Sequence, residues 1–181
     1  MVMVMEQREL EQFIGRHGRD IYSFCCYLTR DKQEADDLYQ DTFVKALELQ
    51  ELPEDEEGAK NLLLSVAVRL WKDRKRKFAR RRRIEEEQYI PGVQKEAELS
   101  ESLNTPEEHM MRSERDGIIR DCVEKLPEKM KVLILLYYME HRKLEEIVEL
   151  TGIPMGTVKS RLHRAKKMLA RELEQNGGME Q

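Results

Sequence analysis

Glycine, proline and aromatic residues are scarce in this chain of 181 residues, which has nine Gly, five Pro and 6% aromatics. A turn-rich β-sandwich needs more turn residues, and runs of β-branched residues bounded by turn signals are missing. These absences argue against an all-β fold and against a doubly wound α/β fold. Charged residues make up 38% of the chain, compared with about 25% in an average soluble domain. The composition therefore predicts an all-α fold built from small helical domains.

Long apolar runs and metal-binding patterns are also missing. No apolar run approaches the ~20 residues of a transmembrane helix, and the first residues lack the basic start and apolar core of a secretory signal. Cys25, Cys26 and Cys122 form no C-x-x-C pair, and the four histidines form no H-E-x-x-H pattern. We therefore expect a cytoplasmic protein without membrane insertion, disulfides, metal or other cofactor, in which the cysteines fill apolar space.

The net charge of −4 conceals blocks of opposite sign along the chain. Residues 61–84 hold ten basic residues and one acidic residue, and residues 129–181 hold ten basic and seven acidic residues. Residues 1–60 and 85–128 hold fifteen and thirteen acidic residues against seven and five basic ones. Two basic blocks separated by acidic ones suggest two contact surfaces for a polyanion, with acidic faces left for another partner.

Apolar periodicity predicts a first helical module. Apolar side chains recur at three- and four-residue steps over residues 6–29, which is typical of an amphipathic helix. Asp31 and Glu34 resemble a capping box that opens a second helix. A long third helix is expected from about Ala59, after an acidic loop, and it continues into a basic run. This module spans residues 1–84.

A second module follows an acidic segment. Residues 85–105 have no sustained apolar period and are predicted to be a flexible linker, whose negative charge suggests the hypothesis that it covers basic surfaces of the free protein. Residues 105–108, Thr-Pro-Glu-Glu, supply an N-cap and a proline at the first helical position. Leu126-Pro127 then separates two helices. This module spans residues 106–176.

The most specific motif lies over residues 143–170. A short helix, a turn containing Gly152 and a second helix make a helix-turn-helix, in which the second helix enters the DNA major groove. A basic run alone usually marks a solvated face, but here residues 154–171 hold six basic residues and no acidic one, in register with the turn. The pattern favours contacts to phosphates and base edges. Its candidate residues are Thr157, Lys159, Ser160, Arg161, His163, Arg164 and Lys167.

An acidic segment over residues 31–43 places Asp37, Gln40 and Asp41 on one face of a helix. Such a cluster serves catalysis, metal binding or the docking of a basic partner, or it is a plain solvated face. A metal site needs further ligands from elsewhere, and the histidines offer no suitable pattern. We therefore interpret this face as a protein-docking surface.

A basic run over residues 69–83 is interleaved with Trp71 and Phe78. This arrangement combines attraction to phosphates with a surface for stacking or packing. A membrane-surface helix or an RNA-binding arm would carry a similar run. Trp71 is more often a core residue than a platform for bases.

Taken in order, these motifs resemble a bacterial RNA polymerase sigma factor of the extracytoplasmic-function group in the sigma-70 family. Residues 35–43, Ala-Asp-Asp-Leu-Tyr-Gln-Asp-Thr-Phe, are similar to the core-binding helix of that family. Residues 152–162, Gly-Ile-Pro-Met-Gly-Thr-Val-Lys-Ser-Arg-Leu, are similar to its minus 35 recognition helix. Leu126-Pro-Glu128 and Glu145-Glu-Ile147 also match, and the likeness covers about residues 8–173.

The resemblance implies a factor that is not an enzyme, binds core RNA polymerase and directs promoter-specific initiation in response to a stress or another signal. Residues 1–84 would be region 2, which melts the minus 10 element, and residues 106–176 would be region 4, which reads the minus 35 duplex. The implied core-binding residues are Asp36, Asp37, Leu38, Gln40, Asp41 and Phe43. The implied contacts to the melted minus 10 strand are Arg69, Lys72, Asp73, Arg76, Lys77 and Arg80. A cognate anti-sigma factor is a further implied partner.

Some residues depart from the family pattern. Leu62-Leu63 stand where Trp then Leu usually open the third helix, and the minus 10 loop over residues 51–58 is acidic and lacks aromatics. Lys143 stands at a cap position where Ser is common, which predicts a weaker cap.

Two other classes of function compete with the sigma-factor interpretation. A stand-alone helix-turn-helix regulator would use residues 1–84 as a sensing or dimerising module and would bind promoter DNA specifically without polymerase. A nucleic-acid enzyme would use the carboxylates near Asp37 and Asp41, but no second constellation completes such a site.

Overall fold

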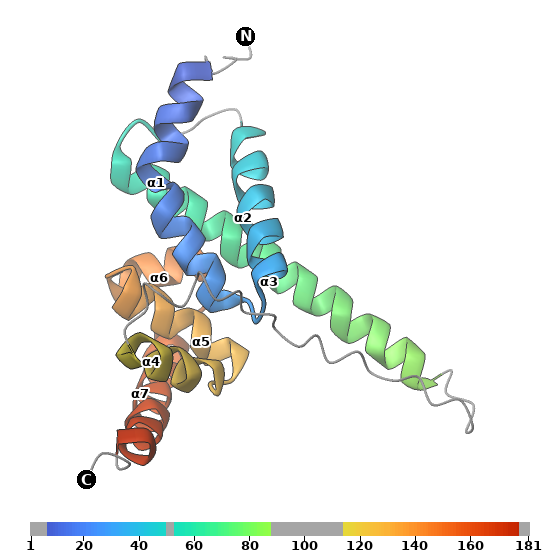
Figure 1. The fold of residues 1–181 in the computed structure, drawn as a ribbon, viewed down its shortest axis with the longest axis vertical. Helices are drawn as coiled ribbons and strands as arrows, with labels where there is room; N and C mark the ends of the chain where they lie inside the picture. The colour runs from blue at the N-terminus through green and yellow to red at the C-terminus, as the bar shows by residue number, and fades with distance from the viewer. Residues whose placement is uncertain (1–6, 50–52, 88–113, 178–181) are drawn as a thin grey trace.

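The computed structural model describes residues 7–49, 53–87 and 114–177, and every regular element within these ranges is helical (Figure 1). The all-α fold predicted from the composition is therefore confirmed. In chain order the elements are α1 (Gln7–Leu28), α2 (Lys32–Leu47), α3 (Glu56–Glu87), α4 (Glu114–Glu124), α5 (Glu128–Ile134), the π-helical turn η2 (Leu135–Met139), α6 (Leu144–Thr151) and α7 (Met155–Gly177).

Helices α1, α2 and α3 form a first bundle around an apolar core. Phe24 of α1, Leu38 of α2, and Leu63 and Leu64 of α3 are fully buried, and such side chains each contribute roughly 1.5–3 kcal/mol on burial. Gly18 of α1 allows a close approach, because a Cβ atom there would lie 2.8 Å from the hydroxyl oxygen of a tyrosine on α2. The first bundle thus holds α2 firmly against α1 and α3.

The cap predicted for the second helix is confirmed. The Asp31 carboxylate accepts a hydrogen bond from the backbone N–H of Glu34 at 2.7 Å, and α2 begins at Lys32. This bond satisfies one of the backbone donors that a helix leaves unused in its first turn.

Helix α3 is longer at both ends than the sequence predicted. It begins at Glu56 instead of Ala59, because the Asp55 carboxylate accepts from the N–H of Gly58 at 2.6 Å and so caps the helix. A Cβ atom at Gly58 would lie 2.7 Å from that carboxylate. The helix also continues to Glu87, so the predicted linker was wrong for residues 85–87, where glutamates, which are good helix formers, extend it.

Helices α4 to α7 form a second bundle. Leu133, Leu136, Ile147 and Val158 are its most buried large side chains. Gly152 ends α6 with a φ of 68°, a left-handed conformation that glycine adopts without steric cost. The predicted helix-turn-helix is therefore confirmed.

Two other predictions concern cysteines and connections. Cys25, Cys26 and Cys122 are buried and form no disulfide with one another, which agrees with their prediction as apolar fillers. Burial raises the pKa of the Cys25 thiol to about 12. The predicted division of helices at Pro127 is confirmed, because α4 ends at Glu124 and α5 begins after the proline. The rest of the predicted linker and the helix start at residues 105–108 lie outside the described residues.

The two bundles pack against each other. Helix α6 lies against α3, while α4 and η2 contact α1 (Figure 1). The sequence predicted two separate modules, and nothing in its local patterns indicated this contact. Beyond Lys75, which pairs with Glu128 of α5, the C-terminal part of α3 extends away from the bundles (Figure 1).

Candidate docking and nucleic-acid interfaces

Some side chains on the acidic face of α2 pair with neighbouring helices, and others are exposed. Asp36 accepts a hydrogen bond from the Tyr22 hydroxyl at 2.9 Å, and Asp41 forms an ion pair with Arg74 of α3 at 2.5 Å. Asp37 and Gln40 are exposed between these two anchors. The face therefore presents its polar groups from a helix that is fixed on both sides.

Leu38 and Phe43 do not belong to that face. Leu38 is fully buried and Phe43 is 5% exposed, so these two of the core-binding residues that the resemblance implied are not on the exposed face of α2. The Phe43 ring lies 6.0 Å from the Phe13 ring and 5.0 Å from the Tyr39 ring, both in edge-to-face geometry. Apolar side chains at these helix positions face α1 and α3, and they hold α2 in place from inside.

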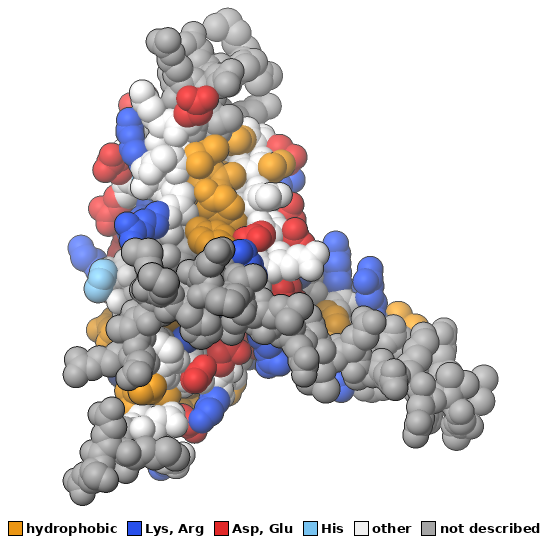
Figure 2. All heavy atoms as spheres, viewed as in Figure 1, with side chains coloured by type: hydrophobic (Ala, Val, Ile, Leu, Met, Phe, Trp, Pro, Cys, Tyr) orange, Lys and Arg blue, Asp and Glu red, His pale blue; other side chains and the backbone are white. Residues whose placement is uncertain are grey.

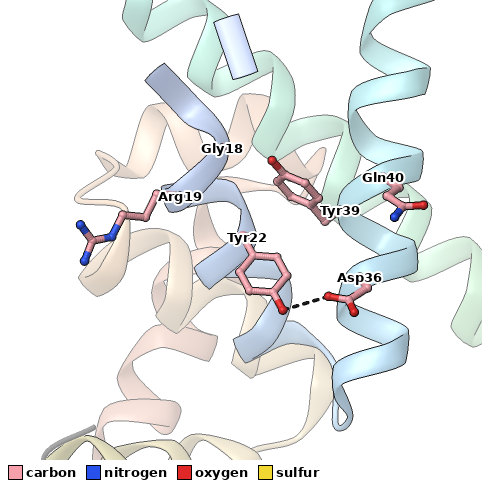
Figure 3. Close-up of a pocket in the computed structure, with 6 residues that line it drawn as sticks. All are labelled: Gly18, Arg19, Tyr22, Asp36, Tyr39 and Gln40. Atoms are coloured by element: carbon pink, nitrogen blue, oxygen red, sulfur yellow. Dashed lines mark hydrogen bonds between the residues drawn. The ribbon is translucent and has the colours of Figure 1, made fainter. Parts of the chain in front are cut away.

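A shallow hollow lies where α1 and α2 meet (Figure 3). Gly18 and Arg19 of α1 and Tyr39 and Gln40 of α2 line it, together with the Tyr22–Asp36 pair. Burial and this hydrogen bond raise the pKa of Tyr22, so its hydroxyl stays protonated as the donor. Beside the hollow, Figure 2 shows a strip of apolar side chains over α1 and α2. The α1–α2 face thus combines apolar surface with acidic groups.

A basic stripe follows α3 away from the first bundle. Arg69, Arg76, Lys77 and Arg80 are exposed. Steps of seven and four residues place Arg69, Arg76 and Arg80 on one side of the helix, with Lys77 next to them. Asp73 of the same stripe pairs with Arg76 at 3.7 Å. Blue side chains along the extended part of α3 are visible in Figure 2.

Lys72, Trp71 and Phe78 have different surroundings. Lys72 is partly buried and donates a hydrogen bond to the carbonyl oxygen of Thr151 at 3.3 Å. Burial and the nearby Arg76 and Arg161 lower the pKa of Lys72. Trp71 is 5% exposed and is a core residue, whereas Phe78 is 63% exposed beside the basic stripe. Phe78 is therefore the aromatic residue of this run that is available to a partner.

The recognition helix α7 presents the face that the sequence predicted. Val158, Leu162 and Ala165 are buried against the second bundle. Of the predicted DNA-contacting residues, five are exposed and Thr157 and Arg161 are partly buried. The exposed ones are Lys159, Ser160, His163, Arg164 and Lys167.

Sequence reasoning missed two residues of η2 beside the helix-turn-helix, Tyr137 and Tyr138. The Lys166 ammonium lies 4.8 Å from the Tyr137 ring centroid and 5.5 Å from that of Tyr138, both on η2. These contacts hold the lysine beside η2. The adjacent tyrosines were the available signal, but their position beside α7 depends on the fold.

The cap of α6 is formed by only half of a capping box. The backbone N–H of Lys143 donates to the Glu146 carboxylate at 2.8 Å, which lowers the pKa of Glu146. No three His, Cys, Asp or Glu side chains gather to hold a metal ion in the described parts of the chain. Of the helices within those parts, none combines the length and apolarity needed to cross a membrane.

Comparison with known families gives two matches. Residues 13–82 match the family described as sigma-70 region 2, and residues 116–169 match the family described as sigma-70, region 4. The first match contains the α1–α2 face and most of α3, and the second contains the helix-turn-helix. Together they cover more than half of the chain.

Full-length relatives agree with these matches. The chain is 29% identical over 169 residues to the ECF RNA polymerase sigma factor SigW of Bacillus subtilis, covering 93% of this chain and 90% of SigW. It is 30% identical over 155 residues to the ECF RNA polymerase sigma-E factor of Haemophilus influenzae, covering 81% and 79%. The fold is similar to that of the sigma factor RpoE solved in complex with the anti-sigma factor NepR from Bartonella quintana, with a TM-score of 0.67 at 21% identity over 92% and 98% of the chains. The chain therefore belongs to the sigma-70 family as an extracytoplasmic-function (ECF) sigma factor, a non-enzymatic initiation factor that directs RNA polymerase to promoters.

Proposed function

We propose that this sigma factor binds core RNA polymerase through the exposed acidic face of α2. The observation that carries the proposal is the fixation of that face by Tyr22 on one side and Arg74 on the other. The backbone that carries Asp37 and Gln40 is thereby already ordered, so only these side chains would lose freedom on binding. Complementary charge on the polymerase would set the orientation and the rate of association more than the affinity.

The test of this assignment is the substitution Asp37→Arg, with Glu174→Arg as control. Both side chains are exposed and both changes reverse one charge, but Glu174 lies near the end of α7. Like charges across an interface cost several kcal/mol, roughly, so Asp37→Arg abolishes co-purification with core polymerase while circular dichroism stays unchanged. Equal binding by the two variants would overturn the assignment of α2.

DNA contacts would be divided between α3 and α7. The basic stripe of α3, with Arg69, Arg76, Lys77 and Arg80 exposed, suits the phosphates of the melted minus 10 strand. Turning bases out of the stack costs a few kcal/mol, roughly, and these charge contacts would offset that cost. On α7, Arg164 would read base edges, while Lys167 would contact phosphates.

The boundaries of region 2 and region 4 are proposed as residues 1–84 and 106–176, with α3 continuing beyond the first of these. A cognate anti-sigma factor would bind this chain, as NepR binds RpoE in the solved complex. The apolar strip over α1 and α2 supports such a partner (Figure 2). We propose that the protein works in the cytoplasm as an alternative factor that answers a stress or another signal.

The stand-alone regulator is not favoured, because residues 13–82 match sigma region 2 and not a sensing module. In vitro transcription with purified core polymerase over a promoter library is the decisive experiment. Sequence-dependent initiation that needs both proteins supports the proposal. Specific promoter binding by the chain alone, with no effect on the polymerase, would contradict it.

A further inference from the structure

The turn η2, which leads into the helix-turn-helix, is wider than a turn of α-helix. The backbone N–H of Glu140 donates to the carbonyl oxygen of Leu135 at 3.1 Å, so this bond joins residues five positions apart. The other regular elements of the described ranges are α-helices. Turns of the π type are rare and occur frequently at functional sites. The place of this one, directly before the DNA-binding motif, suggests that its side chains do more than pack.

The wide turn brings two consecutive tyrosines to the same point on α7. Consecutive residues of an α-helix point about 100° apart, since a turn holds 3.6 residues. On η2, however, the rings of Tyr137 and Tyr138 both lie near the Lys166 ammonium, with their centroids 4.8 and 5.5 Å away. The two rings also contact each other edge to face, with centroids 5.0 Å apart. A cation over an aromatic ring is stabilising, so Lys166 holds both rings beside α7.

The two tyrosines differ in exposure. Tyr138 is 50% exposed, whereas Tyr137 is partly buried against the second bundle. Both rings are held by the same lysine, but Tyr138 presents the larger part of its side chain to solvent. Tyr138 is therefore the member of the pair that a partner can reach.

Tyr138 borders the face of α7 that is proposed to approach DNA. Lys166 follows Lys159 and His163 at steps of three and four residues, and all three side chains are exposed. This spacing places them in one row along the helix. The row lies beside the row that contains Arg164, on the side of α7 that faces η2. Tyr138 therefore flanks the DNA-facing side of α7.

The dimensions of DNA decide what lies at that flank. The major groove of B-DNA is about 12 Å wide, and an α-helix with its side chains is about 10–12 Å across. A recognition helix therefore fills the groove, and each of its flanks faces a phosphate backbone. Tyrosine is among the side chains that contact phosphate oxygens. With the Arg164 row turned toward the bases, Tyr138 meets the backbone on the η2 side.

We propose that the Tyr138 hydroxyl donates a hydrogen bond to a phosphate of the minus 35 duplex and so fixes the rotation of α7 in the major groove. The proposal rests on the proposed function, because it needs α7 to lie in that groove. A contact to phosphate carries no sequence information of its own. A hydroxyl is neutral, so the contact also adds nothing to the release of counterions.

The test is the substitution Tyr138→Phe, with Tyr137→Phe as matched control. Each change removes one hydroxyl and keeps the ring beside Lys166. Binding of the polymerase holoenzyme to minus 35 duplexes is measured by fluorescence anisotropy at several salt concentrations. We expect Tyr138→Phe to weaken binding about fivefold, as for one lost hydrogen bond. The loss is the same for every minus 35 sequence, and the salt slope is unchanged. Tyr137→Phe binds as the wild type, and urea unfolding of both variants matches the wild type.

Lys167→Ala separates failure of this inference from failure of the proposed function. If Lys167→Ala weakens DNA binding while Tyr138→Phe does not, the Tyr138 contact is overturned and the DNA-facing side of α7 stands. If neither variant binds DNA more weakly, that side of α7 is wrong and the Tyr138 contact fails with it. A loss confined to particular base positions would place Tyr138 at a base edge. Weaker binding of Tyr138→Phe to core polymerase alone would assign it to a protein contact. Either result would also overturn the phosphate contact.

Discussion

Lys167 and Lys166 are adjacent on α7, but they should respond differently to removal. Lys167 is exposed on the face proposed to approach DNA, whereas the Lys166 ammonium lies over the rings of Tyr137 and Tyr138. Both substitutions to alanine remove one positive charge from the same turn. A difference in DNA binding between the two variants therefore reports the position of each lysine side chain and not the net charge.

The expected magnitude follows from counterion release. Each phosphate contact contributes about 0.9 to the slope of log K against log salt, so Lys167→Ala should reduce the slope by about 0.9. Between 50 and 200 mM salt, a fourfold change, this makes the defect of the variant shrink by about 3.5-fold. Lys166→Ala should leave the slope unchanged and lower the free energy of unfolding by about 0.5–1 kcal/mol through its lost ring contacts.

The assay is fluorescence anisotropy of the polymerase holoenzyme on a minus 35 duplex at four salt concentrations. Holoenzyme is used because its region 4 is then positioned on DNA. The slope difference depends only on the substituted lysine, since every other phosphate contact is common to both variants. Equal slope changes for Lys166→Ala and Lys167→Ala would refute the assignment of the DNA-facing side of α7.

Three further predictions concern single side chains. Arg164→Ala should cost about 1–3 kcal/mol and relax preference at one or two positions, if the guanidinium reads a guanine; transcription over a randomised minus 35 element measures this, and an equal loss on all sequences would contradict it. Asp31→Ala should lower the free energy of unfolding in urea by about 1 kcal/mol, because the bond to Glu34 N–H is lost. Burial lowers the pKa of His17 from its usual value of 6.5, so its stabilising contribution is complete above that value and lost as the pH falls toward the lowered pKa. His17→Gln should therefore flatten the decline of stability below pH 6.5, and parallel pH profiles of the two proteins would exclude this role.

Features that depend on neighbouring residues in the chain were accessible from the sequence. The start of α2 was predictable because Asp31 and Glu34 are three residues apart, and their bond forms within one turn. Gly152 likewise predicted the end of α6, since a left-handed residue there favours glycine. The start of α3 was missed because the acidic residues after Pro53 were interpreted as a loop, although Asp55 is a good N-cap.

Features that depend on distant residues were not accessible. The ion-paired residues Lys60 and Glu140 are eighty residues apart, and no periodicity relates them. The burial of Phe43 follows from rings supplied by both α1 and α2, so the family motif alone suggested a partner surface. Lys166 appeared as one more cation of a basic helix until the fold placed η2 beside it. The charge pattern predicted an acidic face on α2 and basic faces on α3 and α7. The packing of the helices decides which side chains are exposed on each of these faces.

Because α3 is long, a small change in its tilt within the first bundle moves its C-terminal end by a larger distance. Its first half is packed in the first bundle by Leu63, Leu64 and Val68, whereas about 18 Å of helix, at 1.5 Å per residue, extends beyond Lys75. A tilt of about 10° of this part would move its far end by about 3 Å, which is the length of a hydrogen bond. A small core substitution at Val68 would therefore displace Arg80, which is proposed to contact phosphates of the minus 10 strand, although Val68 itself lies in the core. If the basic stripe contacts DNA as proposed, apolar packing several turns away sets the accuracy of that contact.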